Sequence, residues 1–222
     1  MLFPSYLMGG EFSAFENILR QRALCERHFS SGELIHAKDQ QRQQLSCYLI
    51  SGVLNTRLVH ESGKYTELTV REAGAMFPLF YSSQLTASGR VTEAVAATEC
   101  DVLYIKKREI QSLICEIPAF AIAMIDAYVK LSNLLECALE SRLHDPLQKR
   151  ISDFLVLHMN NDGDIAMTQE GLANALGASR SKTAEALSRL RKKGILETQR
   201  GRIVVVDYNR LLDECSYSVK VG

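Results

Sequence analysis

An unbroken stretch of 26 residues without glycine or proline, from Ala119 to His144, separates two unlike halves of the chain. Pro118 precedes this stretch and Asp145-Pro146 ends it. Because proline interrupts helices and the stretch contains no other helix breaker, it predicts one long helix from Pro118 to His144. The residues before it have strand-like patterns and the residues after it have helical patterns, which predicts an α+β chain with a module boundary near residues 144–147.

The first half has the pattern of a strand-rich domain from Gly32 to about Ile105. Segments such as LSCYLISG (45–52), VLNTRLVHE (53–61) and YTELTV (65–70) alternate or are separated by glycine-containing turns. Turn signals at roughly ten-residue spacing are typical of a β-sandwich or barrel. We therefore expect a β-roll of the double-stranded β-helix or jelly-roll type over residues 1–116, followed by the long helix over 117–145.

The long helix carries two apolar stripes, and a helix that is apolar on two sides has two neighbours. The first stripe has heptad spacing and predicts a seam with a second copy of the chain: Phe120, Met124, Ala127, Leu131, Leu134, Ala138 and Ser141. The second stripe is expected to contact the β-roll: Ile122, Ile125, Val129, Leu135 and Leu139. The alternative is a single buried core helix in a monomer.

Composition excludes several classes of protein. With 46% apolar and 23% charged residues, the chain has the average composition of a soluble globular protein. The longest charge-free apolar run, Ile117–Ile125, is shorter than the roughly 20 residues that span a bilayer, and the N-terminus lacks the pattern of a signal peptide. The six cysteines are scattered. Scattered, unpaired cysteines fit reduced thiols in the cytoplasm.

Residues 167–196, MTQEGLANALGASRSKTAEALSRLRKKGIL, have the pattern of a helix-turn-helix. Thr168 is a candidate N-cap for a short helix that ends at Gly177, and Ser179 is a candidate N-cap for a second helix that ends at Gly194. The inner face of the second helix is expected to consist of Thr183, Ala186, Leu187 and Leu190. The next segment, ILETQRGRIVVVDY, predicts strand, turn and strand, as in the wing of a winged helix-turn-helix over residues 146–222.

The charge of the chain is segregated although its net charge is zero. Residues 178–202 hold 8 basic and 2 acidic residues, and such a cation stripe on a helix and wing neutralises DNA phosphates. The alternative is an ordinary helical hairpin with a solvated basic face. The residues expected to contact DNA bases or phosphates are Thr168, Gln169, Ser179, Arg180, Ser181, Lys182, Glu185, Arg189, Arg200 and Arg202.

A series of short motifs occurs in order along the chain: Ser31-Gly32-Glu33, Ile50-Ser51-Gly52-Val53, Ser62-Gly63-Lys64, Arg71-Glu72-Ala73-Gly74, Ala97-Thr98-Glu99-Cys100, Arg150-Ile151, Thr168-Gln169-Glu170 and Leu176-Gly177-Ala178-Ser179-Arg180. In these motifs and their order, the chain resembles the Crp/Fnr family of bacterial transcription regulators over roughly residues 25–215. The resemblance implies a DNA-binding homodimer that responds to a small-molecule effector, recognises a palindromic site and contacts RNA polymerase.

The recognition helix departs from the family pattern. The family often has Glu at the position of Ser181 and Arg at the position of Glu185. A carboxylate accepts from cytosine N4 but does not make the bidentate guanine contact of an arginine. We therefore expect a half-site different from the usual one for this family.

The effector pocket departs as well. Pro78-Leu79 replaces the family's Gly-Glu, and neither side chain offers the hydrogen bonds that hold a cyclic nucleotide. Arg90 aligns with the phosphate-binding arginine of the family, with Val91 in place of a hydroxyl neighbour. We expect a small, largely apolar effector that is not a cyclic nucleotide, with Arg90 available to an anionic group. The expected effector residues are Phe77, Pro78, Leu79, Arg90, Thr92, Leu135 and Glu136.

An enzyme is the alternative function, in the form of a cupin-like barrel or metal protein whose C-terminal helices mediate interactions. The five histidines do not have the spacing of a cupin metal site. Iron-sulfur relatives carry a cysteine cluster before the roll, where this chain has only Cys25, and no haem ligands are identifiable. No phosphate-binding or nucleophile motif occurs. We expect no catalytic residue, no metal, no cofactor and no membrane partner.

Overall fold

The computed structural model describes residues 7–61, 63, 65–79, 91–160 and 162–215. The chain divides into two compact bodies, one formed by residues 7–63 and 67–134 and the other mainly by residues 135–222. Each body is described separately below. The division falls within the long helix, and the three domain ranges expected from the sequence stay a prediction.

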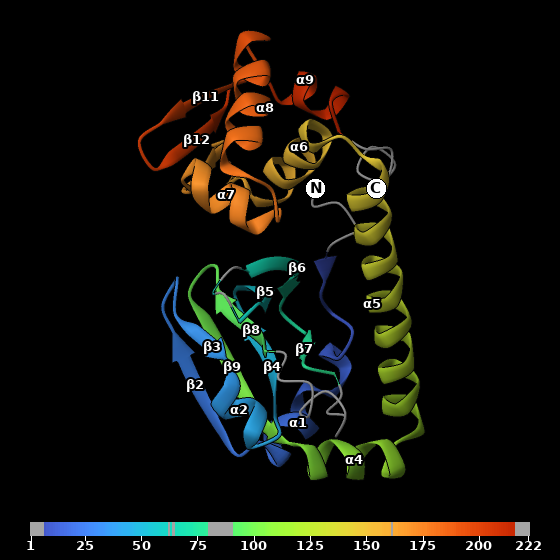
Figure 1. Ribbon diagram of the computed structural model, residues 1–222. Coiled ribbons are helices and arrows are strands. Elements are labelled where there is room, and N and C mark those ends of the chain that lie inside the picture. The colour runs from blue at the N-terminus through green and yellow to red at the C-terminus, as the bar shows by residue number, and fades with distance from the viewer. Residues whose placement is uncertain (1–6, 62, 64, 80–90, 161, 216–222) are drawn as a thin grey trace. The chain divides into compact units, whose positions relative to one another are not determined.

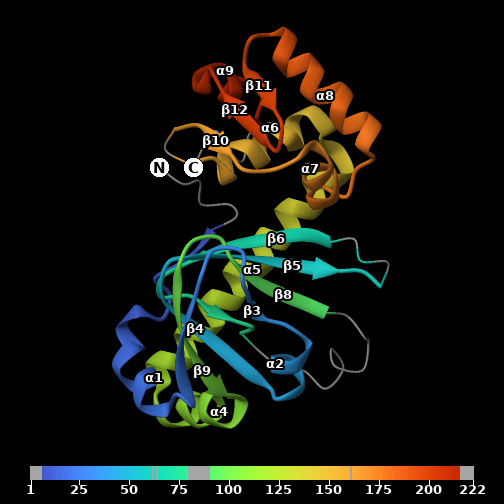
Figure 2. The same ribbon diagram turned by 90° about the vertical axis from the view of Figure 1, so that its left-hand side faces the viewer.

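The first body is a β-roll made of two sheets (Figures 1 and 2). The larger sheet has the strand order β1-β6-β5-β8-β3, with β1 at Leu7–Met8, β6 at Tyr65–Glu72, β5 at Val53–Val59, β8 at Val91–Ala96 and β3 at Leu34–His36. The second has the order β2-β9-β4-β7, with β2 at Cys25–Phe29, β9 at Cys100–Lys106, β4 at Leu45–Ser51 and β7 at Met76–Phe77. A short helix, α2 (Lys38–Arg42), joins β3 to β4.

A core between the two sheets holds the roll together. It combines Ile35, Leu54 and Ala94 of the larger sheet with Leu49 and Val102 of the second. Strand alternation, which sends every second side chain to the same face, produces this core from strands that also carry polar residues. The turn from β4 to β5 needs Gly52, because its φ is +91° and a Cβ there would lie 2.1 Å from the Glu99 carbonyl oxygen. The β-roll expected from the alternation is confirmed.

A segment that precedes the roll was not expected from the sequence. It contains β1, a 3-10 helix η1 (Ser13–Phe15) and helix α1 (Glu16–Arg22). Strand β1 pairs in parallel with β6, with Leu7 opposite Val70 and Met8 opposite Arg71. Met8, Phe12 and Leu19 are fully buried, so this segment belongs to the core of the first body.

Helix α4 (Lys107–Glu116) leads into α5 (Pro118–His144), which has the bounds expected from the sequence. Our assignment of its two stripes is wrong. Phe120, Met124, Ala127 and Leu134 lie in a core cluster of the first body, with Leu131 packed against that cluster. The exposed residues are those of the other stripe: Ile122, Ile125, Val129, Leu135 and Leu139, joined by Tyr128 and Leu143.

By length and composition alone, helix α5 is long and apolar enough to resemble a membrane-spanning helix. In the structure, 22% of its most apolar window is buried. That same composition arises when a helix packs one face into a protein core and leaves another apolar face exposed. The buried Phe120 and Met124 account for the first of these faces.

The second body combines the end of α5 with further helices and a small sheet (Figure 1). Helix α6 (Leu147–His158) is followed by β10 (Asp164–Ile165), α7 (Gln169–Ala175), α8 (Arg180–Lys192), β11 (Leu196–Gln199), β12 (Arg202–Val205) and α9 (Tyr208–Asp213). The strands form an antiparallel sheet in the order β10-β12-β11. One core includes Ile151, Leu172, Leu187, Ile203 and Leu211, so every one of these helices and the sheet contribute to it.

Candidate nucleic-acid interface and effector site

Helices α7 and α8 begin at the N-caps expected from the sequence. The Thr168 side chain accepts from the Gly171 N–H at 3.0 Å, and the Ser179 side chain accepts from the Lys182 N–H at 3.3 Å. Each cap satisfies one of the backbone donors that a helix start leaves free. Between the helices, Gly177 adopts φ +61°, a conformation that favours glycine and allows the sharp turn. The helix-turn-helix geometry is therefore built into the local sequence.

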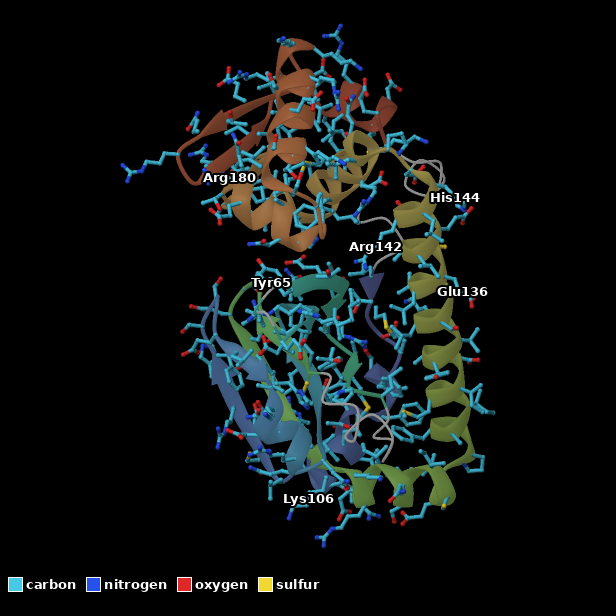
Figure 3. All side chains as sticks on the ribbon, in the orientation of Figure 1. Tyr65, Lys106, Glu136, Arg142, His144 and Arg180 are labelled. Atoms are coloured by element: carbon cyan, nitrogen blue, oxygen red, sulfur yellow. The ribbon has the colours of Figure 1, made fainter. Side chains whose placement is uncertain are left out.

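Helix α8 is amphipathic, and its buried face is the expected one. Thr183, Ala186, Leu187 and Leu190 are all buried against the core of the second body. Its first turns are exposed, and Figure 3 labels Arg180 at the start of α8. All ten residues expected to contact DNA are exposed in the structure. They lie on the α7 start, on the outer face of α8 and in the β11-β12 turn.

Several of these cations have carboxylate neighbours on the protein. Arg189 pairs with Glu185 one turn away at 3.0 Å, and its Nε donates to Gln148 Oε1 at 3.1 Å. Arg202 pairs with Asp164 at 2.7 Å, and Arg180 lies 3.9 Å from Glu170. These exposed pairs are worth little in stability because water screens them. Each of them also competes with a phosphate for the same guanidinium.

Gln148 and Glu170 are parts of this surface that the sequence analysis missed. Gln148 on α6 contacts Arg189 and also donates to Glu214 Oε2 at 2.7 Å. Lys193, which follows α8 directly, forms an ion pair with the same Glu214. No spacing rule joins residues 41 positions apart, so no signal in the sequence indicated the link from α6 to α8.

The expected effector residues are not assembled into one pocket by the described structure. Phe77 is buried in the core between the sheets, whereas Leu79 is buried in a different cluster with Ile110 and Leu113. Pro78 lies between them and is partly exposed, and Thr92 is half-buried on β8. Leu135 and Glu136 are both exposed on α5, where Figure 3 labels Glu136. Arg90 lies outside the described residues. The effector assignment stays a prediction.

Leu79 also lines a groove of about 330 Å³ on the outside of the roll, beside α4. Its other lining residues are Ser46, Lys107, Ile110, Gln111, Ile114 and Cys115. The Ser46 hydroxyl is already engaged, because it donates to the Pro78 carbonyl oxygen at 2.9 Å. This groove shares only Leu79 with the expected effector set.

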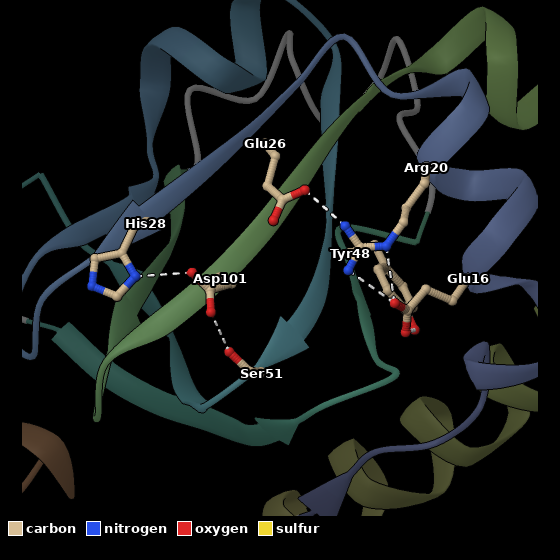
Figure 4. Close-up of polar contacts among 7 residues, drawn as sticks. All are labelled: Glu16, Arg20, Glu26, His28, Tyr48, Ser51 and Asp101. Atoms are coloured by element: carbon tan, nitrogen blue, oxygen red, sulfur yellow. Dashed lines mark hydrogen bonds and ion pairs between the residues drawn. The ribbon is translucent and has the colours of Figure 1, made fainter.

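Figure 4 shows Ser51, Asp101 and His28 joined in a polar network, and these are the residue types of a catalytic triad. Ser51 donates to Asp101 Oδ2 at 2.7 Å, and Asp101 Oδ1 lies 2.9 Å from His28 Nδ1. The hydrogen bond to Asp101 raises the pKa of His28 and lowers that of Asp101 itself. Nucleophile activation needs the base beside the serine oxygen, and here the carboxylate stands between them.

The other network in Figure 4 joins the N-terminal segment to the roll. Arg20 donates to Glu16 at 3.0 Å and to Glu26 at 2.7 Å, while the Tyr48 hydroxyl donates to Glu16 at 3.1 Å. Burial raises the pKa of Tyr48 to about 12, so this phenol stays protonated and acts as a donor.

The described residues contain no group of three His, Cys, Asp or Glu side chains placed to hold a metal ion.

Comparison with known proteins extends over both bodies. A family model described as "Cyclic nucleotide-binding domain" matches residues 26–116, and one described as "Crp-like helix-turn-helix domain" matches residues 149–214. The global nitrogen regulator of Nostoc sp. is 20% identical over 167 residues, which cover 71% of this chain and 75% of that protein. The global nitrogen regulator of Synechococcus elongatus is 22% identical over 166 residues, with the same shares of 71% and 75%.

Solved structures show the same architecture. A putative transcriptional regulator of the Crp/Fnr family from Eubacterium rectale aligns with a TM-score of 0.75 and 20% identity, covering 91% of this chain and 94% of that one. The c-di-GMP responsive global regulator CLP of Xanthomonas campestris aligns with a TM-score of 0.69 and 17% identity, covering 86% and 96%. Because the cyclic nucleotide-binding model matches the roll and the Crp-like model matches the helix-turn-helix, the chain belongs to the Crp/Fnr family of DNA-binding transcription regulators.

Proposed function

We propose that this regulator works as a cytoplasmic homodimer, binds a palindromic DNA site through α8, and changes its DNA affinity when a small molecule other than a cyclic nucleotide occupies the roll. The observation that carries the DNA-binding part is the exposed first turns of α8 inside a Crp-like helix-turn-helix. We propose no catalytic role, because the members of the Crp/Fnr family are transcription regulators. For that reason the proposal also includes contact with RNA polymerase.

The exposed stripe of α5 supports the dimer. Ile122, Ile125 and Val129 are each more than half exposed, and they recur at the three- and four-residue steps of a heptad seam. Leu139 and Leu143 continue the stripe toward the end of the helix. A two-fold dimer contains two α8 helices, and for such a dimer we expect a palindromic site with half-sites about 34 Å apart.

The exposed residues of α8 favour a distinct half-site. Arg180 and Lys182 are cationic, while Glu185 presents a carboxylate that Arg189 holds from one turn below. A carboxylate accepts from cytosine N4, and a guanine O6 and N7 at the same position would repel it. Arg180 is assigned to base reading, and Thr168, Gln169, Arg200 and Arg202 to phosphates.

Selection from a pool of random duplex DNA, followed by binding of the recovered site at several salt concentrations, tests this proposal. A palindrome with cytosine at the Glu185 position and an affinity that falls steeply with salt are expected, because phosphate contacts release counterions. In E185R, the preferred base at that position should change to guanine while the rest of the site is kept. Recovery of no preferred sequence by the wild-type protein contradicts the proposal.

The effector part of the proposal is tested separately. Pro78 offers no N–H, and the Leu79 side chain is buried in a core cluster and has no polar atom. Titration calorimetry with cyclic AMP and cyclic GMP is expected to show no binding at micromolar concentration. Saturable binding of either nucleotide that also raised DNA affinity would overturn this part and leave the DNA-binding part intact.

A further inference from the structure

The inner face of strand β6 carries polar side chains where a roll would ordinarily place apolar ones. Alternation along Tyr65–Glu72 puts Glu67, Thr69 and Arg71 on one face. Thr69 and Thr56 are both buried, and their hydroxyl oxygens lie 2.7 Å apart in a hydrogen bond. Arg71 is 2% exposed and is among the largest fully buried side chains of the protein.

The guanidinium of Arg71 is incompletely satisfied. One terminal N–H donates to the Met76 carbonyl oxygen at 2.6 Å, and the guanidinium carbon lies 5.1 Å from the centroid of the Phe77 ring. Its Nε is buried and has no hydrogen-bond partner, and none of the described carboxylates forms an ion pair with it. A buried cation without a counter-charge is costly, and such a group in a native protein calls for an explanation.

The groups nearest to Arg71 do not supply the missing charge. Glu11 is close enough to favour the charged form of Arg71, but its Oε1 accepts from Lys130 at 2.7 Å and from the Gly9 N–H at 2.9 Å. The Cys47 thiol donates to the Phe77 carbonyl oxygen, and burial raises the pKa of this thiol to about 12. Burial lowers the pKa of Arg71 to about 10, so it stays charged at neutral pH.

The charges around Arg71 therefore leave one positive charge in excess. Glu11 carries one negative charge, and Lys130 already balances it. The other oxygen of Glu11, Oε2, is itself buried without a hydrogen-bond partner. A ligand beside Arg71 would find an unused N–H donor at Nε.

The inner face is not closed along its whole length. On β5, Leu54 and Thr56 are each 1% exposed, whereas Leu58 two positions further is 37% exposed. Thr92, opposite Leu58 in the register of β5 and β8, is half-buried. Because Thr56 is hydrogen-bonded to Thr69, Leu54 lies at the Arg71 end of this face and Leu58 lies at the Glu67 end. The face is therefore closed at Arg71 and becomes accessible at its other end, toward Leu58 and Thr92.

We infer that Arg71 is an anion-binding residue inside the roll, and that it binds the carboxylate or phosphate group of the effector. This inference rests on the proposal that the roll holds an effector, and it deepens that proposal by naming the chemistry of the ligand. The bidentate fork of an arginine suits both anions. Arg71 lies on β6, so this site does not depend on Arg90.

The competing explanation is that Arg71 only fills space against Phe77. The two explanations differ in what methionine does at this position. If Arg71 only packs, R71M loses the contact with Phe77 and the hydrogen bond to Met76, and the protein becomes less stable in every buffer. If Arg71 is an anion site, R71M removes an uncompensated buried charge, and the protein is at least as stable as wild type without the anion.

The experiment measures thermal unfolding of the full chain in inorganic phosphate, in acetate and in chloride at equal ionic strength. The wild-type midpoint is expected to rise saturably with phosphate or with acetate relative to chloride, and the anion that acts identifies the chemical source. R71M should weaken the apparent affinity for that anion at least tenfold, and R71K should weaken it less. R57M is the matched control, because Arg57 is on β5 of the same sheet and pairs with Glu93 at 2.7 Å.

Two results would overturn the inference. One is an anion response that R71M retains at wild-type strength. The other is a wild-type midpoint that neither anion changes, together with a native mass spectrum of protein from its own cells that holds no anionic molecule. DNA binding of wild type and of the same variants is measured in chloride. If neither wild type nor any variant binds DNA, the proposed function is contradicted, whereas the anion site is not.

Discussion

The rings of Phe12 and Phe120 pack against each other with their centroids 5.6 Å apart, which joins the segment before the roll to the long helix. Both side chains are fully buried. Phe15 adds an edge contact to the same Phe120 ring at 5.2 Å. The inner face of α5 is thus covered partly by Phe12 and Phe15, which lie between β1 and β2 in the chain.

Truncation of Phe120 measures how much this contact contributes. F120A should lower the free energy of unfolding by about 3–5 kcal/mol, because it leaves a cavity in a closed core. In a double-mutant cycle with F12A, the two aromatic rings should show a coupling of about 0.5–1.5 kcal/mol. Urea unfolding of the four proteins gives both numbers, and a coupling of zero would mean that the N-terminal segment does not stabilise α5 through these rings.

Charges on the two faces of α5 should have different effects. Replacing Ile125 and Val129 by Asp places charges on the exposed stripe, so we expect a protein that is monomeric at micromolar concentration and has a folded roll. L134D places a charge in a core cluster and should unfold the roll, because a buried unpaired charge costs several kcal/mol. Sedimentation equilibrium and circular dichroism distinguish these results. A dimer that tolerates both Asp residues would exclude this stripe as the interface.

The length of α5 could be predicted from the sequence, but the direction of its faces could not. Pro118 and Pro146 limit the helix, and no residue between them breaks it. The stripe with Phe120 and Met124 has heptad spacing, which indicated a partner helix, yet the roll and the N-terminal segment occupy that face. Both stripes are apolar, and periodicity alone does not say which neighbour each one meets.

Base reading and phosphate binding should separate in single substitutions. R180A should cost about 1–3 kcal/mol on the preferred site and relax the preference at one base pair. R200A, in the turn of the wing, should weaken all sequences alike and reduce the salt slope by about 1. Arg200 is a better phosphate probe than Lys193, because Lys193 pairs with Glu214. Equal losses on specific and random DNA for both variants would refute the role of Arg180.

The DNA-facing residues were predictable because caps, glycine turns and helix faces are local. Ser179 and Gly177 fix where α8 begins, and the exposure of Arg180, Ser181 and Glu185 follows from the helical period. The positions of the expected effector residues depend on contacts between distant strands, which local patterns do not predict. Phe77 and Leu79, which we expected in one pocket, lie in different core clusters. No signal in the sequence indicated a buried Arg71, because Leu68 and Val70 alternate with Glu67, Thr69 and Arg71, and this pattern predicts that Arg71 faces solvent.

Acid should weaken the roll through His36. This ring is buried, its Nε2 lies 3.0 Å from the Leu45 carbonyl oxygen, and burial lowers its pKa to about 4. Since the unfolded chain takes up the proton near pH 6.5, the stability contributed by the neutral ring is complete above pH 6.5. It is lost as the pH falls toward 4, by at most about 1.4 kcal/mol per pH unit.

Unfolding of wild type and H36Q at pH 7 and pH 4.5 isolates this effect. Glu67, whose pKa burial raises to about 7, acts in the opposite direction and is present in both proteins. The variant should therefore lose less stability than wild type between the two pH values. H28Q is the control, because His28 is exposed and its pKa is raised by Asp101. An identical pH dependence for H36Q and wild type would contradict a neutral buried His36.

The pairing of β1 with β6 covers part of one edge of the larger sheet. Two residues, Leu7 and Met8, lie alongside Val70 and Arg71 and cover part of a strand that would otherwise present free N–H and C=O groups. Uncovered strand edges recruit strands from other molecules. The N-terminal segment therefore occupies the Val70–Arg71 end of β6, where a strand from another molecule would otherwise pair.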